Sequence, residues 1–534
     1  MNTRLRALLP GFGLRGVRTA RRIHAWAAGA RAARRAPVTS PPPARGLTIL
    51  SDTTFQQALP WLGISTALAR ALTLRGHQVT SIRCEGFLAQ CEHTLGRQRQ
   101  PSCALCSRGM RAAEEATGLH ALGAASLLTA EDRARAIAAT ALPANDRLDL
   151  MDEGLPLGRL AARELQRFAR GWVGEPASDP HFADWLGSAA VLSALMDRAL
   201  TATAPDLVLT ANGRTLPSAI LTARARQRGI RVVTWDTEPT HPDGLVFSHG
   251  GEAVVVPLDD AWSAHRGQPL DADQRDTLHT FARRWSAAHH PAAGQVPAGL
   301  REGAPLVLAC SNSAWDMAAV DRDVAFRSMF DWLDTVVAAA RRHPGVDVVI
   351  RAHPAERAGT PDLWSRTPVA ATLRGRHRQL PANLHLVDAS ASIDTYALVD
   401  RARVVMVYSS RIGLEAALRG RRPWIAGATT FRGKGFSRDV EGPGDIEAAF
   451  TDQDAGRLTR DEQDLAERFA YLWWFRALVR IPGLRDGHRV MPVPGDAWLA
   501  PGGDPVIDRL CEAVVTGSPF LDLNRPTSWS PRTP

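Results

Sequence analysis

Residues 403–427 read RVVMVYSSRIGLEAALRGRRPWIAG, and this stretch decides the fold. The run RVVMVY is short, apolar and rich in β-branched residues, which predicts a buried strand. From Arg411 to Arg419 apolar residues recur at helical spacing, and PWIAG, residues 423–427, predicts a second strand. A strand, a helix and a strand in this order are typical of a parallel sheet covered by helices, so the stretch predicts an α/β domain.

The same alternation extends outward in both directions. Further strands are predicted at GLTIL (46–50), QVTSIR (78–83), DLVLT (206–210), IRVVTW (230–235), PLVLA (305–309), VDVVIR (346–351) and NLHLV (383–387). We therefore predict two Rossmann-like, doubly wound α/β domains that face a cleft. The predicted segments are a basic arm 1–45, an N-terminal domain 46–260, a helical linker 261–303, a C-terminal domain 304–440, crossover helices 441–490 and a Pro- and Gly-rich tail 491–534.

The composition is that of a globular protein, and its charge is unevenly distributed. The chain has 534 residues, of which 45% are hydrophobic, and a formal net charge of +9. Residues 1–46 contain ten Arg and no Asp or Glu, so the remaining chain is close to neutral and carries no basic excess for nucleic acid. The arm, with its scattered Leu, Phe and Trp, is either a segment that lies on an anionic membrane surface or a disordered terminus. No apolar run reaches the roughly eighteen residues of a membrane-spanning helix.

Four cysteines lie close together in the sequence. Cys84, Cys91, Cys103 and Cys106 form a C-x6-C-x11-C-x2-C series. Four thiolates can complete a tetrahedral zinc site, and the C-x2-C end has the spacing of a metal knuckle. The alternative is a loop that packs reduced cysteines, so the series predicts at most a structural zinc ion.

Polar residues follow the predicted strands of the back half at their carboxyl ends, where open α/β sheets bind ligands. They are Ser311, Asn312, Arg351, His353, Ser409, Ser410, Glu415 and Lys434. Serines at a helix N-terminus can bind phosphate, Arg can hold a phosphate with two hydrogen bonds, and His can donate to a leaving phosphate. Taken singly, Ser410 is as well explained by helix capping and the RGKG loop by a surface turn. Together the residues predict an anion-binding pocket.

These motifs carry a resemblance to a known family. The segments RAHPAE, VYSSRIGLEAALRGRRPWIAG and TFRGKGFSRD resemble the capsule polysaccharide biosynthesis glycosyltransferases of bacteria, which have the GT-B fold and include enzymes that transfer Kdo from CMP-Kdo. Bacterial sialyltransferases, which also use CMP-sugars, share an acidic motif, an HP motif and a Ser motif. Asp152-Glu153-Gly154, His353-Pro354 and Ser409-Ser410 match these motifs in order.

The resemblance implies a nucleotide-sugar donor in the C-terminal domain and an acceptor in the N-terminal domain. It implies that His353, Ser409 and Ser410 contact the donor phosphate and that Glu415 contacts the ribose. Arg411 departs from the pattern, because a small hydroxyl residue is common at its position.

An acceptor hydroxyl needs a base as the glycosidic bond forms, and the front half offers two sets of carboxylates. Asp152 and Glu153 are one candidate pair, although Asp and Glu there are equally suited to the first turn of a helix. Glu238 follows the strand IRVVTW and is the other candidate. Asn212 and Arg214, at another strand end, are candidates for contacts with the acceptor or the sugar.

The sequence thus predicts a glycosyltransferase of surface polysaccharide synthesis. It would transfer a sugar from a nucleotide-sugar donor, with a CMP-sugar favoured, to a glycan or a lipid-linked acceptor. We expect catalysis to need no metal cofactor and the protein to be peripheral on the inner face of a bacterial inner membrane. The alternatives are a polyol-phosphate transferase that uses CDP-glycerol, and a non-catalytic component of polysaccharide assembly or export.

Overall fold

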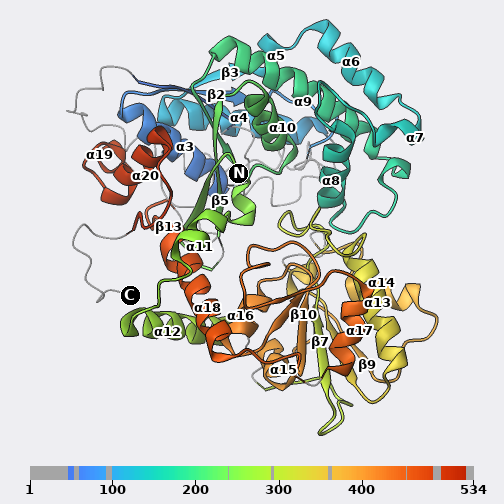
Figure 1. Ribbon diagram of the computed structural model, residues 1–534. Helices are drawn as coiled ribbons and strands as arrows, with labels where there is room; N and C mark the ends of the chain where they lie inside the picture. The colour runs from blue at the N-terminus through green and yellow to red at the C-terminus, as the bar shows by residue number, and fades with distance from the viewer. Residues whose placement is uncertain are drawn as a thin grey trace, which may run out of the picture. The chain divides into compact units, whose positions relative to one another are not determined.

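The computed structural model describes residues 46–52, 59–91, 99–238, 240–289, 294–358, 364–452, 454–484 and 495–524. The basic arm and the end of the tail lie outside the described residues. The chain divides into two compact units (Figure 1). The first unit comprises the residues up to Leu165, Glu175–Pro257 and the residues from Arg476 to Arg525. The second unit comprises Gln166–Gly174 and Leu258–Phe475.

The first unit is built on a seven-stranded sheet in the order β13-β6-β5-β4-β1-β2-β3. The strands are β1 (Thr48–Ser51), β2 (Gln78–Arg83), β3 (His120–Gly123), β4 (Leu207–Ala211), β5 (Arg231–Thr237), β6 (Gly244–His249) and β13 (Val479–Arg480). β1 to β5 are parallel, whereas β6 pairs antiparallel with β5, and β13 with β6. Without its antiparallel edge the order is that of a Rossmann fold, in which the chain switches direction between β1 and β4.

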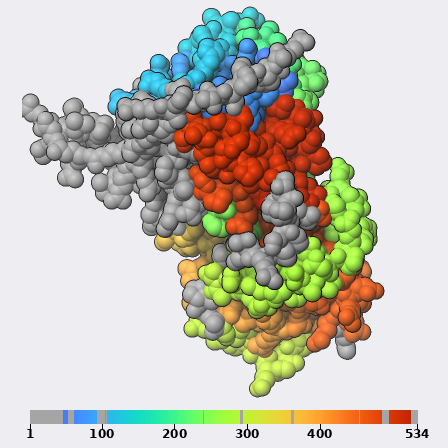
Figure 2. Space-filling model, turned by 90° about the vertical axis from the view of Figure 1, so that its left-hand side faces the viewer, coloured from blue at the N-terminus to red at the C-terminus, as the bar shows by residue number. Residues whose placement is uncertain are grey.

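Helices cover the first sheet. They are α3 (Leu59–Leu74), α4 (Arg99–Thr117), α5 (Ala124–Leu127), α6 (Ala130–Thr140), α7 (Ala144–Arg147), α8 (Leu157–Ala169), α9 (Phe182–Thr203), α10 (Leu216–Gln227), α19 (Asp496–Leu499) and α20 (Pro505–Thr516). The core packs strand residues such as Ile49, Leu207 and Trp235 against α3 and α20. α19 and α20, predicted as part of the tail, thus contribute to this unit, and Figure 2 shows them in red on its surface.

The second unit holds a six-stranded parallel sheet in the order β12-β11-β10-β7-β8-β9. The strands are β7 (Leu306–Cys310), β8 (Asp347–Arg351), β9 (Leu384–Val387), β10 (Val404–Val407), β11 (Pro423–Ile425) and β12 (Arg438–Asp439). Numbered from β7, this is the strand order 6-5-4-1-2-3 of a Rossmann fold. The two predicted Rossmann-like units are therefore confirmed, and the direction switch of the second unit lies between β7 and β10.

The second sheet is covered on both faces. Figure 1 shows α13 and α14 on one side and α15 and α16 on the other. The helices of this unit are α11 (Asp259–His265), α12 (Ala272–His289), α13 (Met329–Arg342), α14 (Val369–Arg376), α15 (Thr395–Arg401), α16 (Ile412–Leu418), α17 (Pro443–Thr451) and α18 (Arg460–Tyr471), followed by a π-helical turn, Leu472–Ala477. α11 and α12, expected to form the linker, belong to this unit. Within the described ranges, no helix has both the length and the apolar character that crossing a bilayer requires.

Candidate functional site

Three neighbouring strands of the second unit carry the predicted site at their carboxyl ends. β7 lies between β10 and β8, and the register pairs Cys310 with Val407 on one side and with Arg351 on the other. The loops after these three strands therefore start at the same level of the sheet. This is the direction switch of the fold, the place where open α/β sheets bind their ligands.

A hydrogen bond joins the loops on the two sides of the switch. The side-chain oxygen of Asn312, after β7, accepts from the backbone N–H of Ser409, after β10, at 3.0 Å. The hydroxyl of Ser409 is buried and has no hydrogen-bond partner within the described structure. A buried hydroxyl without a partner is costly, so this oxygen is a group that a polar ligand would satisfy. Ser410 beside it is also buried.

His353 follows β8, and its protonation state is set by its neighbours. Its Nδ1 accepts from the backbone N–H of Ala355 at 3.2 Å and lies 3.4 Å from the Ser313 hydroxyl. Burial lowers the pKa of His353, a drop that Asp316 opposes and that Arg411 and Arg351 reinforce. The neutral ring therefore carries its proton on Nε2, and His353 can donate one hydrogen bond without being a cation.

Arg351 takes a more structural position than the sequence predicted. One of its Nη atoms donates to the backbone carbonyl of Asp388, which follows β9, while its buried Nε makes no hydrogen bond among the described residues. Its own carbonyl accepts from the Ser311 hydroxyl at 3.3 Å. Arg351 thus ties the ends of β7, β8 and β9 together beneath the site and supplies positive charge there.

Glu415 on α16 lies in a small polar cluster. One carboxylate oxygen accepts a short hydrogen bond from the Tyr396 hydroxyl, and the other lies 3.6 Å from Nε of Arg411. The Arg411 guanidinium lies 5.0 Å from the centre of the Trp285 ring. α16 has seven residues, so its dipole is short, and the side chains rather than the helix end define this part of the site.

Lys434 is the only Lys in the chain, and its ammonium forms an ion pair with Asp259 at the start of α11. Its side chain is 9% exposed, whereas that of Asp259 is 84% exposed. The predicted cation of the RGKG loop is therefore neutralised by a residue from the segment expected to be a linker. The aromatic residues Phe431 and Phe436 on either side are buried and stack at 6.5 Å.

The carboxylates proposed for the acceptor side lie in the first unit. Asp152 and Glu153 both accept from Arg224 on α10, at 2.6 and 2.9 Å, and they precede α8 rather than cap it. Glu238, directly after β5, is buried and accepts from the backbone N–H of Thr240 at 2.8 Å. All three carboxylates thus have partners of their own within the unit.

Asn212 and Arg214 shape the turn between β4 and α10. Asn212 has a φ of +38°, and its side-chain oxygen accepts from the backbone N–H groups of Arg214 and Thr215 at 2.7 and 3.0 Å. The Arg214 guanidinium, almost fully buried, pairs with Glu252 at 2.8 Å. Their contacts are therefore those of a loop scaffold at the carboxyl edge of the first sheet.

A carboxyl group that the sequence analysis did not single out lies at the direction switch of the first unit. Asp52 directly follows β1, is 1% exposed, and accepts from the Thr210 hydroxyl on β4 at 2.6 Å. Burial raises the pKa of Asp52 to about 6, against the opposing hydrogen bonds from Thr210 and from the Ala211 backbone. The signal in the sequence was a Ser-Asp pair ending the strand GLTIL, which is weak without knowledge of the strand order.

The four cysteines of the predicted zinc site lie on α4 and between β2 and α4. Cys103 and Cys106 lie on the helix α4, whereas one of the two alternatives from the sequence was a loop, and Cys84 follows β2. Burial raises the pKa of the Cys84 thiol to about 11, and the nearby thiols of Cys91 and Cys103 add to the rise. In the part of the chain that the structure describes, no group of three or more His, Cys, Asp or Glu side chains is arranged to hold a metal ion. The structural zinc ion therefore stays a prediction.

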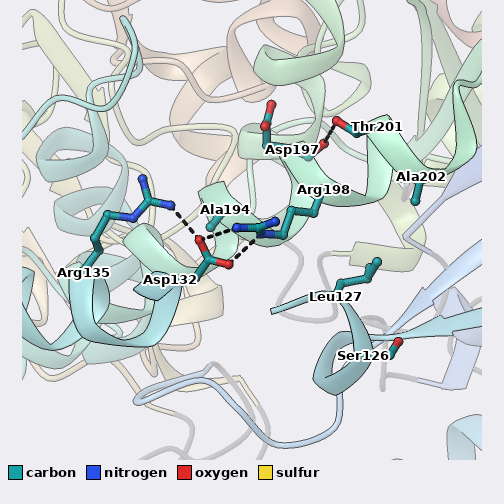
Figure 3. Close-up of a pocket in the computed structure, with 9 residues that line it drawn as sticks. All are labelled: Ser126, Leu127, Asp132, Arg135, Ala194, Asp197, Arg198, Thr201 and Ala202. Atoms are coloured by element: carbon teal, nitrogen blue, oxygen red, sulfur yellow. Dashed lines mark hydrogen bonds and ion pairs between the residues drawn. The ribbon is translucent and has the colours of Figure 1, made fainter. Parts of the chain in front are cut away.

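Two hollows lie away from these strand ends. One, of about 400 Å³, lies between α6 and α9 of the first unit (Figure 3). There the buried Asp132 holds both Arg135 and Arg198 at 2.6 Å, and Asp197, which also lines the hollow, pairs with Arg228. The other, of about 520 Å³, lies at the loop from Arg376 to Ala382, before β9 and thus at the amino-terminal edge of the second sheet. Neither contains a residue of the predicted site.

Residues 283–449 match a family model described as capsule polysaccharide biosynthesis protein. The match spans about a third of the chain and includes β7 to β12, with every residue of the candidate donor site. The predicted resemblance to capsule polysaccharide biosynthesis proteins is thereby confirmed for this segment. No curated protein matches the chain at a significant level.

Solved structures similar to this chain include two KpsC enzymes of Thermosulfurimonas dismutans. The β-Kdo 2,4 transferase is 15% identical, with 49% of this chain and 78% of that chain covered and a TM-score of 0.33. The β-Kdo 2,7 transferase is 12% identical, with 55% and 83% covered and a TM-score of 0.32. A UDP-GlcNAc 2-epimerase from Neisseria meningitidis, bound to UDP-GlcNAc, is 12% identical, with 79% and 97% covered and a TM-score of 0.23. The fold described above rests on the strand order itself and not on these similarities.

Proposed function

We propose that this protein is a glycosyltransferase that transfers a sugar from a nucleotide-sugar, preferably a CMP-sugar, to a glycan or lipid-linked acceptor during surface polysaccharide synthesis. The observation that carries the proposal is the group at the direction switch of the second unit. There the Ser409 hydroxyl and Nε2 of His353 are donors at the place where a Rossmann-like sheet binds its ligand. The match of residues 283–449 to the capsule polysaccharide biosynthesis model supports a role in surface polysaccharide synthesis.

In this proposal each unit has one task. The acceptor oxygen forms a bond to the anomeric carbon while the bond from that carbon to the phosphate oxygen breaks, and the nucleotide leaves with the electron pair. Neutral donors such as His353 and Ser409 stabilise the developing charge on the leaving phosphate. The acceptor proton passes to a carboxylate of the first unit. Our candidate is Glu238, because its carboxylate accepts hydrogen bonds from Thr240, whereas Asp152 and Glu153 are held in ion pairs by Arg224.

We further propose that the transfer needs no divalent metal and that the protein works at the inner face of a bacterial inner membrane. The basic arm would hold it there through anionic lipid. Activity that survives EDTA tests the first statement. Sedimentation of the full chain, but not of residues 46–534, with vesicles containing phosphatidylglycerol tests the second.

Binding of nucleotides to the purified protein tests the proposal. A ligand that binds only the native state stabilises it by about 2.7 kcal/mol at a hundred times its Kd. We expect CMP to raise the melting temperature more than UMP or GMP, and His353→Ala to abolish the rise. His385→Ala is the matched control, since His385 lies on β9 of the same unit outside the site.

The transfer step has its own test. Glu238→Gln should keep the nucleotide-induced stabilisation but lose sugar transfer from a CMP-sugar. The proposal is wrong if no nucleotide stabilises the wild-type protein and no nucleotide-sugar is hydrolysed or transferred. Glycerol-phosphate transfer from CDP-glycerol would instead favour the polyol-phosphate alternative.

A further inference from the structure

A short segment that lies between first-unit helices in the sequence belongs to the second unit. Gln166–Gly174 spans the end of α8 and the chain after it, while the residues on both sides, up to Leu165 and from Glu175, belong to the first unit. We call Gln166–Gly174 the strap. The strap lies within residues 46–260, the predicted N-terminal domain, so its place in the second unit is a finding of the structure.

The backbone of the strap is fixed to the loop that follows the HP motif. The carbonyl of Arg170 accepts from the N–H of Arg366 at 2.9 Å, and the N–H of Trp172 donates to the Thr367 hydroxyl at 2.7 Å. A Cβ on Gly171 would lie 2.6 Å from that hydroxyl oxygen, closer than real Cβ atoms come. The close approach therefore requires glycine at this position.

The Trp172 ring anchors the strap on the core of the second unit. Its centre lies 5.3 Å from that of Phe330, a fully buried residue of α13. The guanidinium of Arg376 lies 5.4 Å from the Trp172 ring centre. Aromatic packing of this kind holds the strap independently of the backbone bonds.

The other end of the strap holds the loop after β7, which carries half of the candidate donor site. The side-chain amide of Gln166 donates to the backbone carbonyl of Ala314, and the guanidinium of Arg170 lies 3.9 Å from the centre of the Trp315 ring. Ala314 directly follows Ser313, and Trp315 directly precedes Asp316. The strap thus holds the two residues that lie between the two groups acting on His353.

Ser313 and Asp316 reach His353 in different ways. The Ser313 hydroxyl lies 3.4 Å from Nδ1 of His353. Asp316 acts through its charge, and one of its oxygens also accepts from the N–H of Ala318 at 2.9 Å, which orients the carboxylate. A shift of the loop would therefore change the environment of His353 without any contact between His353 and the strap.

We propose that the strap is a positioning element of the donor site. Through its contacts with Ala314 and Trp315, the strap keeps the Ser313 hydroxyl beside Nδ1 of His353 and fixes the position of the Asp316 carboxylate relative to that ring. Arg170 is the main positioning residue, because its cation lies directly on the Trp315 ring. As a statement about donor binding, this rests on the proposed function. The placement of His353 is a statement about the protein alone and can be tested without a ligand.

The first measurement is an NMR titration of His ring resonances in the free, full-length protein, with His353 assigned by His353→Gln. Arg170→Ala should let Asp316 move away and lower the pKa of His353, because Asp316 is the carboxylate that raises it. Arg170→Lys keeps a cation for the ring and should restore most of the wild-type titration. Arg159→Ala, an exposed arginine of α8 outside the strap, is the matched control and should change nothing.

A double-mutant cycle separates positioning from general destabilisation. Asp316→Asn should lower the pKa of His353 as Arg170→Ala does, and the double variant should add little to either single variant. The Kd for CMP, measured by calorimetry, should rise about tenfold in Arg170→Ala, the range expected for a lost cation–π contact, and again without additivity. Circular dichroism confirms that each variant is folded.

The outcomes are distinct. An unchanged His353 titration in folded Arg170→Ala overturns the strap proposal, whether or not nucleotides bind. Additive effects in the double variant overturn the route through Asp316. If the wild-type protein binds no nucleotide while Arg170→Ala still shifts the His353 titration, the proposed function fails and the positioning of His353 by the strap stands.

Discussion

Glu356, three residues after His353, should make the stability of the second unit depend on pH in the neutral range. The residue is 0% exposed, and its carboxylate accepts from the backbone N–H of Val369 at the start of α14, at 3.1 and 3.3 Å. Burial raises the pKa of Glu356 from 4.5 to about 7, against the opposing hydrogen bond from Val369. The folded protein therefore holds this proton more tightly than the unfolded chain does.

The sign and the size of the effect follow from that difference. A raised folded pKa contributes stability that is fully present below pH 4.5 and is lost as the pH rises through about 7. Between pH 5 and pH 8.5 the loss amounts to about 2.5 kcal/mol of unfolding free energy. Glu356→Gln keeps an oxygen that accepts from the Val369 N–H, and its side chain cannot ionise. The variant should therefore lose none of this unfolding free energy as the pH rises.

Urea unfolding at several pH values measures the effect, with Glu441→Gln, an exposed glutamate of the same unit, as the control. The unfolding free energies of wild type and Glu356→Gln should diverge steadily above about pH 5, with the variant the more stable at pH 8.5. Parallel pH profiles for the two proteins would refute the reasoning, because they would mean that Glu356 ionises with the same pKa in the folded and unfolded chain.

Three further predictions concern single groups. Asn312→Leu leaves the Ser409 N–H without its partner and should lower the unfolding free energy by about 1–3 kcal/mol, measured by urea unfolding. Tyr396→Phe removes the hydroxyl that orients Glu415 and should weaken nucleotide binding about tenfold by calorimetry, while an unchanged Kd would show that this hydroxyl is not needed to place Glu415. Asp52→Asn should stabilise the protein by about 3 kcal/mol at pH 8 and give little gain at pH 4, because burial raises the folded pKa of Asp52 to about 6. Equal effects at both pH values would contradict this.

Nine of the thirteen described strands could be predicted from the sequence, because a buried parallel strand is a short apolar run that needs no long-range information. DVVIR and VVMV are such runs, and the structure places β8 and β10 there. The sequence did not predict β3 or the strands β6, β12 and β13, which lie toward the edges of the two sheets. The strand order could not be predicted in the same way, because pairing joins residues far apart in the chain. Where Asn312 contacts Ser409, polar groups of two neighbouring strand ends do meet, since parallel strands share one carboxyl edge.

The partners of the candidate residues were the part that the sequence could not reveal. Asn312 and Ser409 are 97 residues apart and Lys434 and Asp259 are 175 apart, and no local pattern links either pair. The segment that holds Cys103 and Cys106 fits two local patterns, the C-x2-C spacing of a metal knuckle and the composition of a helix. The segment from Arg99 to Thr117 has no proline except near its start, and it forms the helix α4.

The charges around the donor site lead to a last prediction, on salt dependence. Arg351 donates to a backbone carbonyl, Arg411 pairs with Glu415, and Lys434 pairs with Asp259. Apart from the buried Nε of Arg351, the donors that remain for a phosphate, Ser409 and the neutral His353, carry no net charge. Salt screens exposed charges far more than hydrogen bonds to buried neutral groups. We therefore expect the Kd for CMP to change less than about threefold between 0.05 and 0.3 M NaCl. A steep loss of affinity with salt would show instead that one of the three cations leaves its partner and binds the phosphate directly.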